Sequence, residues 1–183
     1  MYAGILQSLK EVIISQQGST QHEPTPTEFF AIILSSLCSG KQKTHVVELL
    51  EILVTVIPRS ATSIVRSQFQ PLSVVLMGLC KVNIDNSKVI RLCLSCLARS
   101  LQQQETSEAF WKSRESMQSL NALLKLIDDP KIKLRKTVQD ELVSLLQVHK
   151  QQKATFMRSY VAEFCIEIMK ACKKSDYKRA LHV

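Results

Sequence analysis

A pattern that returns after 44 residues constrains this chain more than any other feature. Two stretches, 85–101 and 129–145, carry matching residue types in the same order. Asp85, Ile90, Arg91, Leu94 and Leu101 correspond to Asp129, Leu134, Arg135, Val138 and Leu145. An earlier, degenerate copy has Val46, Leu50 and Ile57 at the apolar positions, with Lys41 and Val47 in place of the Asp and the Arg. The chain therefore repeats one structural unit of about this length.

Each copy is predicted to be helical, because its apolar residues recur at helical spacing. In the last copy, Leu134, Val138, Leu142 and Leu145 fall on one face of a helix. A two-helix unit of this length is typical of HEAT repeats. We therefore expect an all-α fold, a right-handed α-solenoid of HEAT-like helix pairs forming an armadillo-type superhelix. The expected pairs span 27–57, 60–103 and 108–149, and further helices are expected at 2–17 and 153–173.

The whole of 1–183 is predicted to be a single HEAT-repeat array. Residues 176–183 resemble the first turns of one more helix, which the chain does not complete. Solenoid ends normally carry polar capping repeats. The chain is therefore expected to be a fragment of a longer solenoid.

Capping and breaking residues mark where the helices begin and end. Helix starts are expected after Thr25 or Thr27, after Ser60, and after Thr106 or Ser107. Gly40 is expected to end the helix before it, and Pro71 to kink or split a helix. Asp129 and Pro130 are expected to open the helix of the last copy, with the proline in its first turn.

The charge of the chain is uneven. Residues 1–90 hold 7 Lys and Arg against 6 Asp and Glu, whereas residues 91–183 hold 17 against 10. A basic half suggests an acidic partner, with RNA as the first candidate, and an ordinary solvated lysine-rich surface explains it about equally well. No run of 18 apolar residues occurs, so a membrane span is not expected.

Residue patterns for catalysis or for a cofactor are missing from the sequence. The four His have no spacing that suggests a metal site or a triad, and there is no glycine-rich phosphate loop. Cys93 and Cys96 have the spacing of a redox or zinc pair, but no second pair accompanies them. We expect the six cysteines to be reduced core residues, with a metal or redox role as the alternative. No enzyme activity and no cofactor are predicted.

Two groups of charged residues are candidate functional residues. Asp85, Arg91, Asp129 and Arg135 are expected to form a structural ladder in which an Asp at one helix start meets an Arg of the neighbouring repeat, with ligand contact as the alternative. Arg99, Lys133, Lys136 and Lys150 are expected to project from second helices onto the concave surface. Such a stripe could bind the phosphates of RNA, or it could be a solvated face.

Five stretches resemble, in order, the N-terminal HEAT region of the ribosomal RNA-processing protein 12 family. They are Leu9-Lys-Glu-Val-Ile, Thr27-Glu-Phe-Phe-Ala, Val89-Ile-Arg-Leu-Cys-Leu-Ser-Cys-Leu-Ala, Asp129-Pro-Lys-Ile-Lys-Leu-Arg-Lys and Phe164-Cys-Ile-Glu. A Lys- and Ser-rich turn follows, as Lys173-Lys174-Ser175. The chain departs from the family where a second proline is usual, because Ile132 stands there.

The resemblance implies a large, non-enzymatic nuclear and nucleolar HEAT scaffold. Such a scaffold takes part in pre-ribosomal RNA processing and in nuclear export of ribosomal subunits. Its implied partners are pre-ribosomal particles, through their RNA and proteins, and nuclear transport factors, with no membrane and no small-molecule substrate. The alternative is a karyopherin-like or other HEAT adaptor that binds only proteins.

Overall fold

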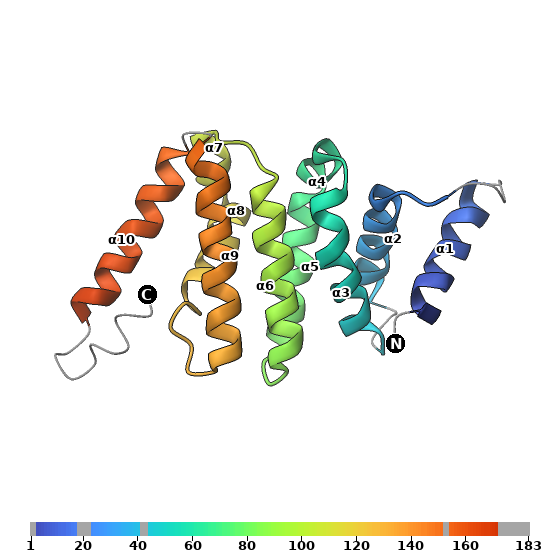
Figure 1. Ribbon diagram of the computed structural model, residues 1–183, viewed down its shortest axis with the longest axis horizontal. Helices are drawn as coiled ribbons and strands as arrows, with labels where there is room; N and C mark the ends of the chain where they lie inside the picture. The colour runs from blue at the N-terminus through green and yellow to red at the C-terminus, as the bar shows by residue number, and fades with distance from the viewer. Residues whose placement is uncertain (1–2, 18–22, 41–43, 152–153, 172–183) are drawn as a thin grey trace. The chain divides into compact units, whose positions relative to one another are not determined.

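Helices make up the regular structure of the chain. The computed structural model describes residues 3–17, 23–40, 44–151 and 154–171, and within these ranges it has ten α-helices, one 3-10 turn and no strand (Figure 1). In chain order they are α1 (Ala3–Gln17), α2 (Pro26–Ser39), α3 (Val46–Val56), η1 (Ile57–Arg59), α4 (Thr62–Ser67), α5 (Phe69–Val82), α6 (Ser87–Gln102), α7 (Glu108–Trp111), α8 (Arg114–Leu124), α9 (Ile132–Gln151) and α10 (Thr155–Ala171). The expected helix start at 176–183 lies outside the described residues.

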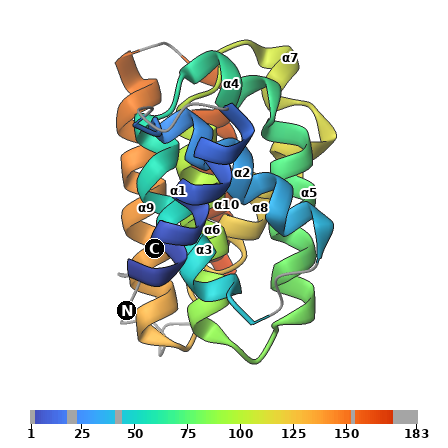
Figure 2. The same cartoon turned by 90° about the vertical axis from the view of Figure 1, so that its right-hand side faces the viewer.

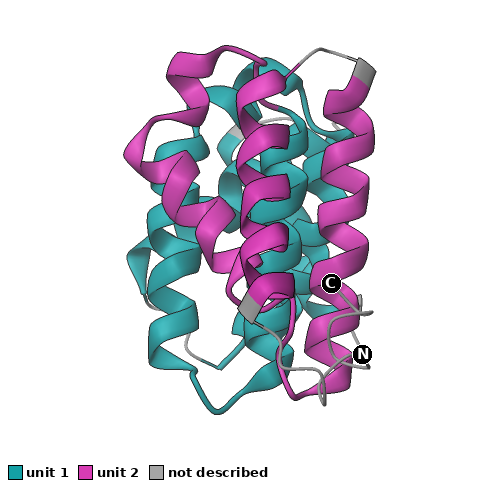
Figure 3. Ribbon diagram, turned by 90° about the vertical axis from the view of Figure 1, so that its left-hand side faces the viewer, with its two compact units in different colours: residues 1–103 teal, residues 104–183 magenta. Residues whose placement is uncertain are grey.

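The chain divides into two compact units, residues 1–103 and residues 104–183 (Figure 3). In unit 1, α2 packs on α3, α5 packs on α6, and these two pairs meet through α3 with α6 and α2 with α5. The unit therefore has one layer of α2 and α5 and a second layer of α3 and α6. Helix α1 packs on α2, at the end of the unit away from α5 and α6 (Figure 1, Figure 2).

Most of the repeated apolar positions lie in the core of each unit, as the 44-residue period predicts, but Val46 and Ile90 are only partly buried. In unit 1, Leu50, Ile57, Leu94 and Leu101 are all buried. In unit 2 the equivalent residues, Val138 and Leu145, are fully buried. The apolar face of α2 is buried as well, through Phe29, Phe30, Ile33, Leu34 and Leu37. The sequence period thus marks the packed face of α3, α6 and α9.

The start and end of α2 follow the predicted signals. Thr25 accepts a hydrogen bond from the N–H of Glu28, and the Glu28 carboxylate accepts one from the N–H of Thr25 at 2.7 Å, which completes a capping box. Thr27, the other candidate cap, accepts the N–H of Ala61 at 3.0 Å instead. Gly40 ends the helix with φ of 65°, a left-handed conformation that glycine adopts without steric cost.

The predicted split at Pro71 is confirmed, and the predicted cap at Ser60 is wrong. Helix α4 ends at Ser67 and α5 begins at Phe69, because the Pro71 ring would clash with the carbonyl of Ser67 in a continuous helix. Ser60 donates its hydroxyl to the carbonyl of Val56 at 2.8 Å, and α4 starts after Ala61 without a side-chain cap. The Ser60 hydroxyl therefore completes the preceding turn and does not begin the next helix.

Unit 2 has two short helices, α7 and α8, where one first helix is expected for the pair 108–149. Ser107 caps α7 as predicted, but Ser113 caps a separate helix α8 by accepting the N–H of Ser116. Pro130 lies in the bend before α9, two residues ahead of its first residue, whereas the first turn was predicted for it. The Asp129 carboxylate accepts the N–H of Lys131 at 2.8 Å, so the acid does satisfy a backbone donor at this helix start.

An aromatic contact joins α7 to α9, and a tyrosine hydroxyl joins α10 to α8. Trp111 is fully buried and meets the edge of the His149 ring at 5.2 Å between centroids. His149 lies in the last turn of α9, yet it is fully buried on the face of Leu142 and Leu145. On α10, Tyr160 donates its hydroxyl to the side chain of Asn121 at 2.9 Å.

Candidate functional site

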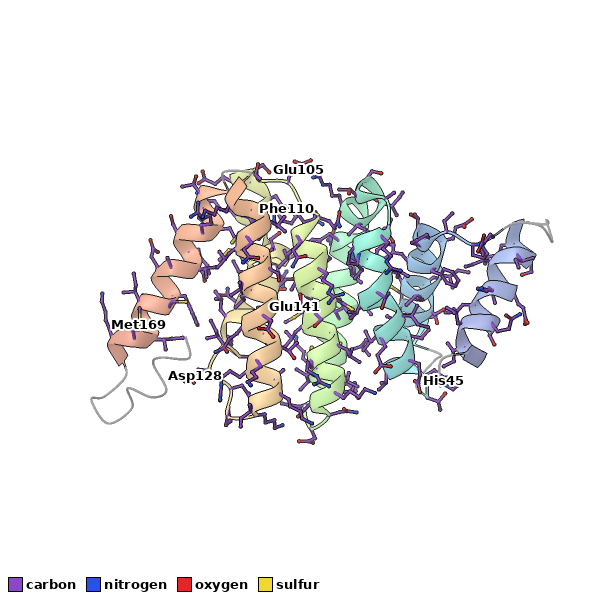
Figure 4. All side chains as sticks on the ribbon, in the orientation of Figure 1. His45, Glu105, Phe110, Asp128, Glu141 and Met169 are labelled. Atoms are coloured by element: carbon purple, nitrogen blue, oxygen red, sulfur yellow. The ribbon has the colours of Figure 1, made fainter. Side chains whose placement is uncertain are left out.

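Two of the candidate lysines lie near the start of α9. Lys133 and Lys136 are exposed and one turn apart, and Lys131 just before the helix is exposed too. Figure 4 shows Asp128 beside this end of the helix and Glu141 about half-way along it. The lysines of this end therefore form a local basic cluster with acidic neighbours at its edge.

Lys150, the third candidate lysine, is exposed in the last turn of α9. It shares a helix face with Lys136 but lies 14 residues further on, about 21 Å along the axis. Asp140 and Val143 occupy the same face between them, and Val143 is 52% exposed. Along α9 the positive charge is thus concentrated at the two ends, and the expected stripe is interrupted in the middle.

Arg99, the fourth candidate for RNA binding, makes a structural contact inside unit 1. Its guanidinium donates a hydrogen bond to the carbonyl of Val54 at 2.8 Å, from α6 to the last turn of α3. That carbonyl would normally accept the N–H four residues later, but residue 58 is a proline and has none. Arg99 therefore completes the end of α3. Its expected projection onto a concave surface remains a prediction.

The residues of the expected ladder show contacts within one repeat. Arg135 donates to the backbone carbonyl of Asp129 at 2.9 Å, so this pair fastens the loop to the first turn of α9. In the equivalent place of unit 1, Asn86 caps α6 by accepting the N–H groups of Lys88 and Val89, and Asp85 is exposed. The ladder between successive repeats remains a prediction.

The expectation that all six cysteines are core residues is correct for the two cysteines of α6 and wrong for Cys38, which is exposed. Cys80 and Cys165 are partly buried, and Cys172 lies outside the described residues. Cys93 and Cys96 are both fully buried. A hydrogen bond with the Cys80 thiol, together with burial, raises the pKa of Cys93 above its usual range. Within the described ranges, no group of three or more His, Cys, Asp or Glu side chains is placed to hold a metal ion. Over the same residues, none of the helices has both the length and the apolar character needed to cross a bilayer.

A groove between α9 and α10 is a feature that the sequence analysis did not anticipate. It has a volume of about 440 Å³ and is lined by apolar side chains with two cations, Lys150 from α9 and Arg158 from α10. Arg158 was missed, although it shares a helix face with Ala162 and Cys165 at i, i+4 and i+7. The groove thus places one of the candidate lysines beside apolar surface.

Stacked helix pairs with buried positions that recur every 44 residues define an α-helical repeat protein of the HEAT class. A family model described as "RRP12-like, N-terminal HEAT repeats" matches residues 5–179, and the chain belongs to this family. The human "RRP12-like protein" is 26% identical over 190 residues. That alignment covers 98% of this chain and 14% of the human protein, so the chain spans about one seventh of the length of this relative.

Proposed function

We propose that the chain is a non-enzymatic part of a nuclear and nucleolar scaffold that assists ribosome biogenesis. The observation that carries this proposal is the match of residues 5–179 to the RRP12-like family. The scaffold would act in pre-ribosomal RNA processing and in export of ribosomal subunits, in contact with pre-ribosomal particles and nuclear transport factors. This role requires docking surfaces and no reaction centre.

Within this role, we propose direct RNA contact at the start of α9. Lys131, Lys133 and Lys136 are exposed there, and backbone phosphates are the RNA groups that such lysines recognise. Exposed lysines can neutralise phosphates without reading the bases, so the contact is expected to be indifferent to sequence. Arg99 is less suited to this contact, because its guanidinium already serves the Val54 carbonyl.

Crosslinking in cells tests the proposal. The protein that contains this chain would be crosslinked to RNA by ultraviolet light, and the bound RNA sequenced, for the wild type and for a variant with Lys131, Lys133 and Lys136 changed to Ala. We expect pre-ribosomal RNA to dominate the wild-type crosslinks and to be depleted in the variant. Crosslinks to proteins alone would favour the karyopherin-like or other adaptor that binds only proteins, a reading that the apolar groove also supports.

A further inference from the structure

The α9–α10 groove has a geometry that suits a protein segment better than a nucleic acid. Its walls are mostly apolar, with Val143 and Leu146 on α9 and Val161 and Ala162 on α10, and Gln147 is the uncharged polar side chain among the described lining residues. Both cations lie at one end, because Lys150 is in the last turn of α9 and Arg158 is in the first turn of α10. The groove therefore runs from a charged end, near the turn that joins the helices, to an apolar end.

The shape of the groove is set by contacts on the opposite face of α10. Phe156 stacks on Tyr160, Lys112 of α7's cap lies 5.2 Å from the Phe156 ring centre, and Tyr160 is bonded to Asn121 of α8. Phe156 and Tyr160 are about half a turn around the helix from Arg158. Since these contacts hold α10 from its far side, the face with Arg158 is left open toward α9, from which α10 diverges in Figure 1.

Charge decides what can fill the groove. Neither Lys150 nor Arg158 has an ion-pair partner within the part of the chain that the structure describes, and no acidic residue lines the groove. Glu163 and Glu167 lie on the far face of α10, and Asp140 lies ten residues before Lys150, about 15 Å along α9. A second copy of this chain, with a net charge of +8, is a poor match.

We propose that the α9–α10 groove binds an acidic amphipathic helix of a partner protein. Leu-like side chains of the partner at i, i+3, i+4 and i+7 would lie on Val143, Leu146, Val161 and Ala162, as in other complexes of a helix with an apolar groove. Its carboxylates would meet Lys150 and Arg158 at the charged end. Lys150 then binds a protein carboxylate, and the RNA contact proposed above belongs to the lysines at the other end of α9.

The probe for this site is a fluorescein-labelled helical peptide with Leu at i, i+3, i+4 and i+7 and Glu on its other face. Anisotropy titrations would use the complete chain. We expect the double variant Lys150→Ala with Arg158→Ala to weaken peptide binding at least tenfold. Ala162 is exposed and lines the groove, so Ala162→Trp should fill the space and weaken binding similarly. The matched control removes one Lys and one Arg from exposed sites at the two ends of α8, Arg114→Ala with Lys125→Ala, and should change binding less than twofold.

Cys165 reports binding directly, because it lines the groove and is partly buried. Burial raises the pKa of this thiol, so alkylation would be followed at pH 8 by mass spectrometry. The peptide should slow alkylation of Cys165 and leave exposed Cys38 of unit 1 unchanged. Unprotected Cys165, or equal loss of binding in the control pair, would overturn the proposal. Protection of Cys165 by a duplex RNA, without protection by the peptide, would also overturn the proposal. None of these results depends on the RNA contact proposed at Lys133 and Lys136.

Discussion

Arg99 supplies a hydrogen bond that the backbone of α3 cannot make. The Val54 carbonyl lies where Pro58 offers no N–H, and the guanidinium takes that place at 2.8 Å. Arg99→Ala should therefore lower the free energy of unfolding by about 1–3 kcal/mol, the cost of leaving a part-buried acceptor without its donor. Urea denaturation followed by circular dichroism measures this. Lys136→Ala, which removes an exposed charge, should stay within about 0.5 kcal/mol of the wild type.

A double-mutant cycle separates this explanation from a general loss of packing. Pro58→Ala restores a backbone N–H that can serve the Val54 carbonyl. In that background Arg99→Ala should cost clearly less than it does beside Pro58, because the acceptor keeps a donor. An identical cost in both backgrounds would show that the Val54 contact is not what makes Arg99 important.

Single residues were the hardest part of the molecule to predict. The sequence places His149 on the same helix face as Leu142 and Leu145, a spacing that could have indicated burial. The residue type alone indicates the opposite, because histidine is usually at least partly exposed. Arg99 was treated as a surface charge for the same reason. Its contact depends on a proline 41 positions earlier in the chain, and only the pairing of α3 with α6 brings the two together.

At the scale of helices, replacement of glycine by alanine is expected to change stability in opposite directions at two positions. Gly78 lies inside α5, and a Cβ there would meet nothing within 4 Å, so Gly78→Ala should stabilise by about 0.5–1 kcal/mol. Gly40 also has open space around it, but its φ is 65°, and Gly40→Ala should destabilise by about 1 kcal/mol. Urea midpoints for the two variants should therefore move in opposite directions. Shifts of the same sign would mean that neighbouring contacts outweigh the backbone conformation.

Helix breaks were predictable where a backbone constraint causes them. Pro71 forbids a continuous helix through its position, and the split between α4 and α5 follows from covalent structure. The break between α7 and α8 has no such cause, since Ser113 is tolerated inside helices and caps one only when its own backbone is extended. Trp111, two residues before Ser113, is fully buried, and the local sequence does not reveal that burial. The 44-residue period predicts which helix faces are buried, but it does not predict the break between α7 and α8.

At the scale of the whole molecule, net charge and charge position make different contributions to RNA binding. Net charge acts at long range, and salt screens it over about 10 Å at 0.1 M. Counterion release instead depends on cations that touch phosphates. The candidate site could be predicted only as a set of exposed cations, because the sequence does not show which of them contact other parts of the chain. Arg99 contacts Val54 and Lys150 lines the groove, so Lys131, Lys133 and Lys136 are left as the compact cluster.

Two variants with equal net charge test that cluster. One changes Lys131, Lys133 and Lys136 to Ala, and the other changes three lysines elsewhere, Lys10, Lys81 and Lys125. Binding to a duplex RNA would be titrated at several salt concentrations for both and for the wild type. If each clustered lysine neutralises one phosphate, the slope of log affinity against log salt should flatten by about 2–3 units in the first variant. The second should keep the wild-type slope, since its lysines are scattered over α1, α5 and the turn after α8. Equal flattening in both would mean that RNA responds to net charge alone, and the start of α9 would then be an ordinary solvated face.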